Sequence, residues 1–281
     1  MRALRFASSL SLISLIVFGC APAVPPAPPT AVAVSESPTE FSWRPPAWKS
    51  GMALRYRTET FQEVRRGDSI LTSTSQLQVL ELSFGARNAR GVMPMRARID
   101  GTDVADIFID QNGQPNDFSL LVALSSDEAE AIEFALNAFI HGPVGKRLES
   151  LHLRLDRPER IEMPIGELLG ATMKLVSPAP AVLDVRIVYA GHRLIEGART
   201  VELRVISTLR GRGHQFRLRG QDEPVRMDAF EGETTMYVDP DRQFSVRTYQ
   251  SLSSQLRAKG LNLTSRQVSA VVLDRTASKS L

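Results

Sequence analysis

Eight consecutive residues, Ala53-Leu54-Arg55-Tyr56-Arg57-Thr58-Glu59-Thr60, decide the fold class of this chain. Leucine, tyrosine and threonine occupy every second position from Leu54 to Thr60, and charged side chains stand between them. Because successive side chains of a strand point to opposite faces of a sheet, a period of two indicates a half-buried strand. The stretch therefore predicts a strand and not a helix.

The same alternation recurs along the chain. It returns at residues 75–81 and 200–206, and glycines such as those of Gly67-Asp68, Gly85 and Gly91 separate the runs. Residues 107–113, Ile-Phe-Ile-Asp-Gln-Asn-Gly, read as a strand that ends in an Asn-Gly turn, which is a strong hairpin signal. We therefore predict a mainly β, antiparallel fold that is either a half-barrel or a sandwich.

One segment departs from this pattern and predicts an amphipathic helix near residues 126–140. Ser125 is a suitable N-cap with Glu128 three residues later, and Gly142-Pro143 ends the run. Apolar residues stand at helical spacing between these signals, at Ile132, Leu136, Phe139 and Ile140. We expect this apolar stripe to cover one face of the sheet.

The second half of the chain echoes the first. The matching stretches are 51–56 with 170–175, 75–81 with 200–206, and 107–112 with 236–241. The echoes predict a two-fold internal repeat. The expected organisation is a signal peptide (1–19), a lipidated cysteine with a Pro-rich tether (20–48), a first β repeat with the helix (49–141), a connector (142–169) and a second β repeat (170–281).

Residues 1–19 read as a secretory signal peptide. Arg2 and Arg5 precede an apolar run, Leu10 to Phe18, that is too short to span a bilayer core of about 30 Å. The run ends in Val17-Phe18-Gly19-Cys20, which resembles the lipobox of bacterial lipoproteins. This resemblance implies that the leader is removed and Cys20 is acylated. Ala21 in place of Asp implies, by the same resemblance, an outer-membrane anchor that faces the periplasm.

The segment 20–48 is a predicted tether. Residues 21–48 contain eight prolines and few charges. Runs such as Pro25-Pro26-Ala27-Pro28-Pro29 favour extended polyproline conformation at about 3.1 Å per residue, so these residues would reach about 85 Å. We expect such a tether to hold the folded part away from the membrane.

Composition excludes several classes of protein. The single cysteine excludes a disulfide scaffold and a Cys-rich zinc module. The chain has 34 Lys+Arg and 31 Asp+Glu, and removal of Arg2 and Arg5 with the leader leaves 32 against 31. The net charge of the mature chain is therefore close to zero. Because proteins that bind nucleic acid are usually basic, we predict no nucleic-acid partner.

Catalytic motifs are missing from the sequence. There is no Gly-x-Ser-x-Gly nucleophile elbow, and the four histidines, at 141, 152, 192 and 214, do not have the short spacing of a metal motif. We therefore predict no enzymatic activity, no cofactor and no metal site.

Arginines concentrate between Arg193 and Arg219, a stretch that contains seven arginines and only two glutamates. Four of these, Arg210, Arg212, Arg217 and Arg219, surround a Gly-flanked turn and the strand after it. They are a candidate patch for an anionic ligand, because guanidinium groups match phosphate well. The alternative is a solvated strand face whose charge is offset by acids on neighbouring strands.

As architecture, the mature part is similar to several uncharacterised, duplicated, β-rich envelope lipoproteins, and residues 158–166 look like the strand and turn that open a second repeat in them. It resembles more loosely the half-barrels that carry lipids or lipoproteins across the periplasm. We predict a non-enzymatic, outer-membrane-anchored lipoprotein that binds or scaffolds an anionic lipid or an envelope protein. The alternative is a carrier or chaperone for lipid or lipoprotein, with an apolar cavity between sheet and helix.

Overall fold

The computed structural model describes residues 24–44, 46–122, 148–149, 151–169, 173–176, 180–218 and 223–278. The predicted signal peptide with Cys20 lies outside the described residues, and so does the predicted helix at 126–140.

Strands account for most of the described residues. In chain order the elements are β1 (Val32–Ala33), β2 (Glu40–Ser42), β3 (Ala53–Arg66), β4 (Ser69–Phe84), β5 (Met93–Ile99), β6 (Thr102–Ile109), β7 (Pro115–Leu120), β8 (His152–Arg154), β9 (Pro158–Pro164), α2 (Gly166–Leu169), β10 (Met173–Leu175), β11 (Val182–Ile195), β12 (Ala198–Leu209), β13 (His214–Leu218), β14 (Pro224–Val238), β15 (Ser245–Ala258) and β16 (Leu261–Leu273).

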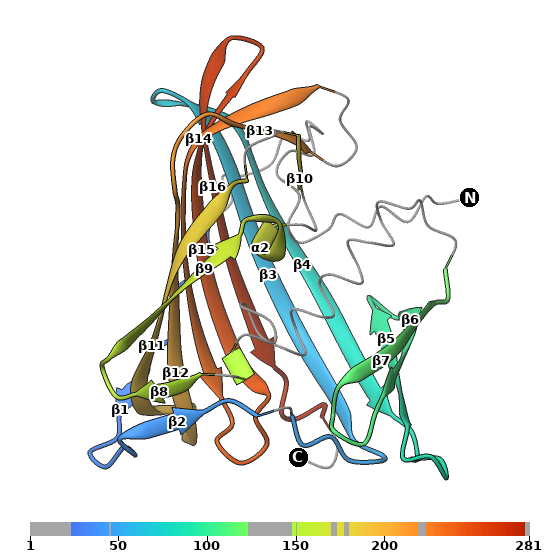
Figure 1. Ribbon diagram of the computed structural model, residues 1–281. Helices are drawn as coiled ribbons and strands as arrows, with labels where there is room; N and C mark the ends of the chain where they lie inside the picture. Colours follow the sequence, from blue (N-terminus) through green and yellow to red (C-terminus); the bar gives the residue numbers. More distant parts are fainter. Residues whose placement is uncertain are drawn as a thin grey trace.

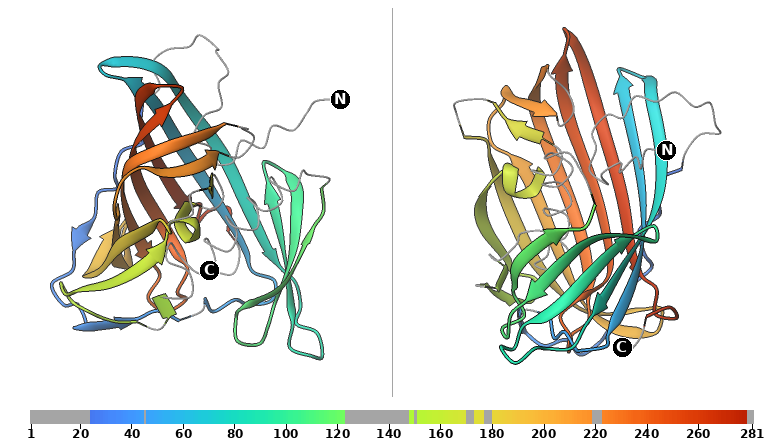
Figure 2. Two further views of the ribbon diagram at one scale, coloured as in Figure 1. Left: turned by 45° about the horizontal axis from the view of Figure 1, so that its top comes forward. Right: turned by 90° about the vertical axis from the view of Figure 1, so that its right-hand side faces the viewer.

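Fourteen of these strands form one sheet. Its main path runs β1-β11-β12-β14-β15-β16-β3-β4-β5-β6-β7, while β9, β10 and β13 pair at its side and β2 pairs separately with β8. Every strand pair in the sheet is antiparallel. The sheet is strongly curved and does not close, as Figures 1 and 2 show. The mainly β, antiparallel prediction is confirmed, and the strands form one open curved sheet and not two sheets of similar size packed face to face.

The predicted internal repeat is not shown by the structure. Residues 51–56 lead into β3, a 14-residue strand between β4 and β16, whereas their proposed counterpart at 170–175 contains β10, a three-residue strand that pairs with β13. Strands share the same residue types, so short echoes in sequence do not specify equivalent places in a sheet.

Part of the predicted connector, 142–169, belongs to the fold. Its residues 152–154 form β8, which pairs with β2, and its residues 158–164 form β9. β9 pairs with β11 from Val182↔Pro164 to Val188↔Pro158. The strand that was expected from 158–166 is therefore present, but as an edge strand of the same sheet.

The predicted tether, 20–48, is also partly folded. β1 pairs with β11 and β2 pairs with β8. Trp43 and Trp48 are buried, and each joins a different apolar cluster of the sheet. Tryptophan side chains bury large apolar areas, which outweighs the preference of the surrounding sequence for a solvated, extended chain. Only the residues before Val32 remain as candidates for a free spacer.

A strap formed by residues 34–41 holds this segment to β11. The backbone N–H of Val34 donates to the carbonyl of His192 (3.1 Å), and the N–H of His192 donates to Ser37 Oγ (2.8 Å). The hydroxyl of Tyr189 donates to the carbonyl of Pro38 (3.1 Å), and its ring lies 5.7 Å from that of Phe41. The contacts centre on an irregularity in the β11–β12 pairing between Tyr189 and His192.

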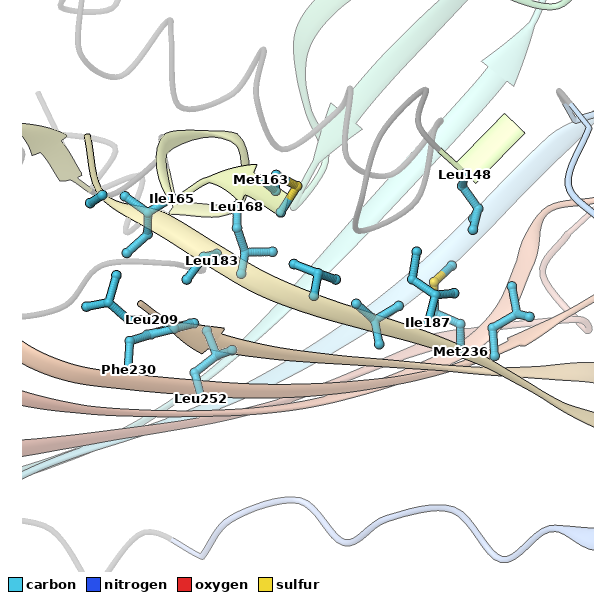
Figure 3. Close-up of a cluster of buried hydrophobic side chains, with 14 of the residues drawn as sticks. Leu148, Met163, Ile165, Leu168, Leu183, Ile187, Leu209, Phe230, Met236 and Leu252 are labelled. Carbon is cyan, nitrogen blue, oxygen red and sulfur yellow. The ribbon is translucent and has the colours of Figure 1, made fainter. Parts of the chain in front are cut away.

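The concave face of the sheet carries two apolar clusters. The first draws on β9, α2, β11, β12 and β14, and Figure 3 shows Leu168 of α2 beside Leu183 of β11. The second draws mainly on β3 to β6, with Trp48 stacked 4.8 Å from Phe84. Residues that pair across neighbouring strands share a face, so the alternation in each strand places its apolar side chains on the same side.

A band of buried and half-buried polar side chains crosses the concave face between the two clusters. Thr234, Gln250, Ser269 and Thr60 stand in one row across β14, β15, β16 and β3. Gln250 Nε2 donates to Thr234 Oγ1 (3.2 Å), and in the next row Gln62 Nε2 donates to Gln267 Oε1 (3.1 Å). These hydrogen bonds limit the cost of burying the polar groups.

Replacing Leu203 by alanine should lower the free energy of unfolding by about 2–5 kcal/mol, because Leu203 is fully buried in the first cluster. The matched control is Leu77→Ala on β4, where the side chain is 56% exposed and the change should stay within about 0.5 kcal/mol. Urea unfolding of both variants measures the difference, and equal effects would contradict the assignment of the core.

Gly191→Ala should destabilise the protein more than Gly197→Ala. Both glycines have positive φ, 90° and 79°, so alanine costs about 1–2 kcal/mol at either position. At Gly191 an added Cβ would also lie 2.9 Å from Ser37 Oγ, whereas at Gly197 it meets nothing within 4 Å. Overpacking of this kind adds about 1–3 kcal/mol, which urea unfolding would detect. Equal destabilisation would show that the strap yields without cost.

Candidate functional site

One arginine of the predicted anionic-ligand patch, Arg210, is paired with acids on neighbouring strands. Arg210 donates hydrogen bonds to Glu162 of β9 (2.7 Å) and to Asp184 of β11. The hydrogen bonds to Asp184 and Glu162 raise the pKa of Arg210 above its ordinary value. At this position acids on neighbouring strands offset the charge, which is the alternative that the sequence left open.

The other three arginines of the patch lie in different places. Arg212 lies in the turn between β12 and β13, Arg217 lies on β13, and both are exposed. Within the described part of the chain neither forms an ion pair. Arg219 lies outside the described residues, so the predicted face of all four arginines stays a prediction.

Three more arginines of the 193–219 run serve the structure of β11 and β12. Arg193 and Arg204 each donate to the carboxylate of Glu202 at 2.5 Å, and the Glu202 side chain is only 3% exposed. A buried carboxylate is costly unless it is paired and hydrogen-bonded, so these two arginines stabilise it in place. Arg199 donates from Nε to His192 Nδ1 (2.7 Å) and from Nη2 to the carbonyl of Glu36 (3.2 Å), which adds to the strap.

A second candidate surface lies where two hairpins end side by side. β3 turns into β4 at Gly67-Asp68, and β15 turns into β16 at Lys259-Gly260. Because β16 pairs with β3 as far as Thr264↔Arg65, the two turns are neighbours, at the top of Figure 1. We call residues 65–71 and 257–262 the hairpin end.

Exposed apolar side chains mark the hairpin end. Ile70 and Leu71 are each 54% exposed, and Leu261 is 38% exposed. They do not extend the apolar core, because the next five residues of β4, 72–76, are Thr, Ser or Gln, and the first buried residue of that strand is Leu82. These side chains therefore contribute little to the packing of the sheet.

The hairpin end is also positively charged. It contains four basic residues, Arg65, Arg66, Arg257 and Lys259, and one acid, Asp68, which gives +3. Arg65 pairs with Glu63 (2.6 Å) and Lys259 with Glu223 (3.3 Å), both of which lie just outside it. Arg257 donates to the neutral Asn262 (2.9 Å), and Arg66 is exposed. Among the described residues, Arg66 and Arg257 form no ion pair.

Sequence reasoning did not find the hairpin end. Its two parts are separated by about 190 residues, and only the β16–β3 pairing joins them. The available signal was the position of Ile70 and Leu71 directly after the Gly67-Asp68 turn, where polar residues are usual in a solvated hairpin.

Two shallow pockets among the described residues have linings that mix charged and apolar side chains. One, of about 190 Å³, lies over β3, β4, β5 and β6 among Arg55, Glu81, Arg96, Arg98 and Asp103. The other, of about 290 Å³, lies among Asp239, Arg242, Phe244, Leu273 and Arg275. In the first, Arg98 pairs with Asp103 at 2.9 Å, so its charges are largely satisfied within the pocket.

The described ranges contain no group of three or more His, Cys, Asp or Glu residues that could hold a metal ion. They also contain no helix with the length and hydropathy needed to cross a membrane. No protein-family model matches the chain, and no curated protein matches it.

His192 should make the stability of the protein depend on pH. Burial and the nearby Arg199 guanidinium lower the pKa of His192 below its ordinary value of 6.5. As the pH falls below about 6.5, the unfolded state binds a proton that the folded state does not, so stability falls until the pH reaches the lowered folded-state pKa.

The measurement is urea unfolding of the native protein and of His192→Asn between pH 7.5 and 5. Asparagine keeps an acceptor for Arg199 but has no titratable group. The carboxylates and the remaining histidines therefore contribute equally to the pH dependence of the unfolding free energy in both proteins. The native protein should lose more stability than the variant over this interval. Parallel curves would contradict the prediction.

Proposed function

We propose that this protein is a lipoprotein of the bacterial cell envelope, anchored by an acylated Cys20 in the outer membrane and facing the periplasm. The support is the apolar leader followed by Val17-Phe18-Gly19-Cys20, with the only cysteine of the chain at the position that acylation requires. Acyl chains contribute about 0.8 kcal/mol for each buried methylene, so more than one chain gives a stable anchor.

The folded domain is held closer to the membrane than the whole 20–48 segment would allow. Packing begins at Val32, so at most residues 20–31 act as a spacer. Twelve residues in extended polyproline conformation reach about 37 Å.

We further propose that the domain is a non-enzymatic binding or scaffolding module. The observation that carries this proposal is the hairpin end, where Ile70, Leu71 and Leu261 are exposed beside Arg66 and Arg257, which form no ion pair with the described residues. Neither feature contributes to the packing of the sheet, and exposed apolar groups beside charges are typical of surfaces that contact a partner.

A carrier for lipid or lipoprotein is the second candidate. The observation in its favour is the open, curved sheet (Figure 2), which carries two large apolar clusters. The amphipathic helix at 126–140 and the internal repeat are part of the same proposal. What supports the repeat is the order of strands in the sheet, in which five strands of the second half, β11, β12, β14, β15 and β16, are followed by five of the first, β3 to β7. Mass spectrometry of lipid extracted from the purified protein separates the candidates, because only a carrier should retain lipid other than the acyl anchor in stoichiometric amount.

Replacing Cys20 by serine should release the protein from membranes, or leave it uncleaved with a higher mass, because serine cannot form the thioether that carries the lipid. Fractionation of cells and mass spectrometry measure both outcomes. Ala21→Ser is the matched control and should remain in the membrane fraction at the mature mass. A Cys20→Ser protein that matures normally and stays in that fraction would refute the anchor.

A further inference from the structure

We propose that the hairpin end is a second membrane contact, which inserts Ile70, Leu71 and Leu261 into the interface of an anionic bilayer. The proposal deepens the proposed function by naming the partner of that surface, and it rests on that function because the acyl anchor brings the domain to a membrane. It commits to a lipid surface and not to a protein.

The apolar part of the surface has the shape that a bilayer requires. The three side chains stand at the tips of two neighbouring hairpins and not in a groove. Ser, Thr and Gln at residues 72–76 separate Ile70 and Leu71 from the core, so that the two apolar side chains project beyond a polar stem. Projecting tips can enter a fluid surface, whereas small-molecule ligands are held in concave sites.

The charges of the hairpin end complement an anionic surface. Arg66 and Arg257 form no ion pair with described residues, and Arg212 and Arg217 are further exposed cations on the neighbouring β13 side of the sheet. β13 joins this end through its pairing with the start of β14, where Arg217 lies opposite Pro224. Basic groups near anionic headgroups attract the surface within a Debye length of about 8–10 Å.

The length of the spacer allows both membrane contacts at once. β1 pairs with the far end of β11, at Val32↔Leu194, which is opposite to the hairpin end. The strand β3, with 14 residues at about 3.3 Å each, is about 46 Å long, and the spacer reaches about 37 Å. In Figures 2 and 3 the blue segment before β1, residues 24–31, runs along the outer side of the sheet, beside the strands. Because the spacer is about 9 Å shorter than the strand, Cys20 and the hairpin end can meet one bilayer only when the long axis of the sheet is tilted away from the membrane normal.

The test uses a chain that starts at residue 20 and carries Cys20→Ser, so that no acyl chain contributes. This chain retains every described strand, and thermal melting verifies that each variant is folded. Co-sedimentation is measured with vesicles of phosphatidylglycerol and phosphatidylethanolamine and with vesicles of phosphatidylcholine alone. Binding to the anionic vesicles is expected to be at least tenfold stronger, and to weaken in 0.5 M salt.

Two variants and two controls locate the contact. Leu71→Ser with Leu261→Ser should weaken binding to anionic vesicles at least tenfold, and Arg66→Glu with Lys259→Glu should abolish the preference for anionic lipid. The controls are Leu77→Ser, on the middle of β4, and Leu194→Ser, at the opposite end of the sheet, which are 56% and 40% exposed. Both controls should bind as the parent chain does.

Several results would overturn the proposal. The first is equal or negligible binding to both kinds of vesicle, and the second is a loss of binding in the controls that equals the loss in the variants. The third is a concentration-dependent dimer in analytical ultracentrifugation that the hairpin-end variants abolish. Such a dimer would assign the surface to a second copy of the chain. These outcomes do not depend on acylation of Cys20. Failure of the vesicle test leaves the acyl anchor standing, and failure of the Cys20→Ser fractionation leaves the vesicle result standing.

Discussion

The antiparallel pairing of β16 with β3 is the interaction on which the rest of the structure depends. It joins ten residue pairs, from Thr264↔Arg65 to Leu273↔Tyr56, between segments about 200 positions apart. Without it the strands of the two halves would form two separate sheets. The hydroxyl of Tyr56, fully buried, donates to the carbonyl of Ser245 (3.0 Å) and ties β3 to the strand beyond β16. Because the loop between the paired residues is so long, forming this pairing carries a large entropic cost.

The same pairing creates the surface that we consider functional. It places the β3–β4 and β15–β16 turns next to each other, so that Leu261 and the Ile70-Leu71 pair form one apolar edge with the basic residues around them. Each turn alone would expose only one or two apolar side chains, which is ordinary for a soluble protein. Their combination at one end is what distinguishes this surface.

The strap is the second constraint, because it decides where the chain leaves the domain. Residues 34–41 are held by backbone contacts to β11, by the Tyr189–Phe41 ring contact and by Arg199, and Trp43 and Trp48 secure the segment that follows. A segment whose proline content predicts a long, solvated tether is thereby shortened to a spacer of about 37 Å. The domain consequently stays within reach of the membrane that we propose as its anchor.

The sequence by itself determined the local structure of this protein. Alternation such as that of residues 53–60 specifies strands, because side-chain direction has a period of two whatever the strand pairs with. Only the tertiary structure decided what depends on pairing between strands. It shows that β9 joins the sheet and that Trp43 and Trp48 are buried. It also shows that residues 170–175, which echo the start of β3 in sequence, do not pair as β3 does. The arginine run shows the same division. Its density is a property of the sequence, but whether Arg210 is free depends on Glu162 and Asp184, and whether Arg193 is free depends on Glu202. Charge pairing and exposed edges are relations between strands that are distant in sequence, so only the folded sheet defines them.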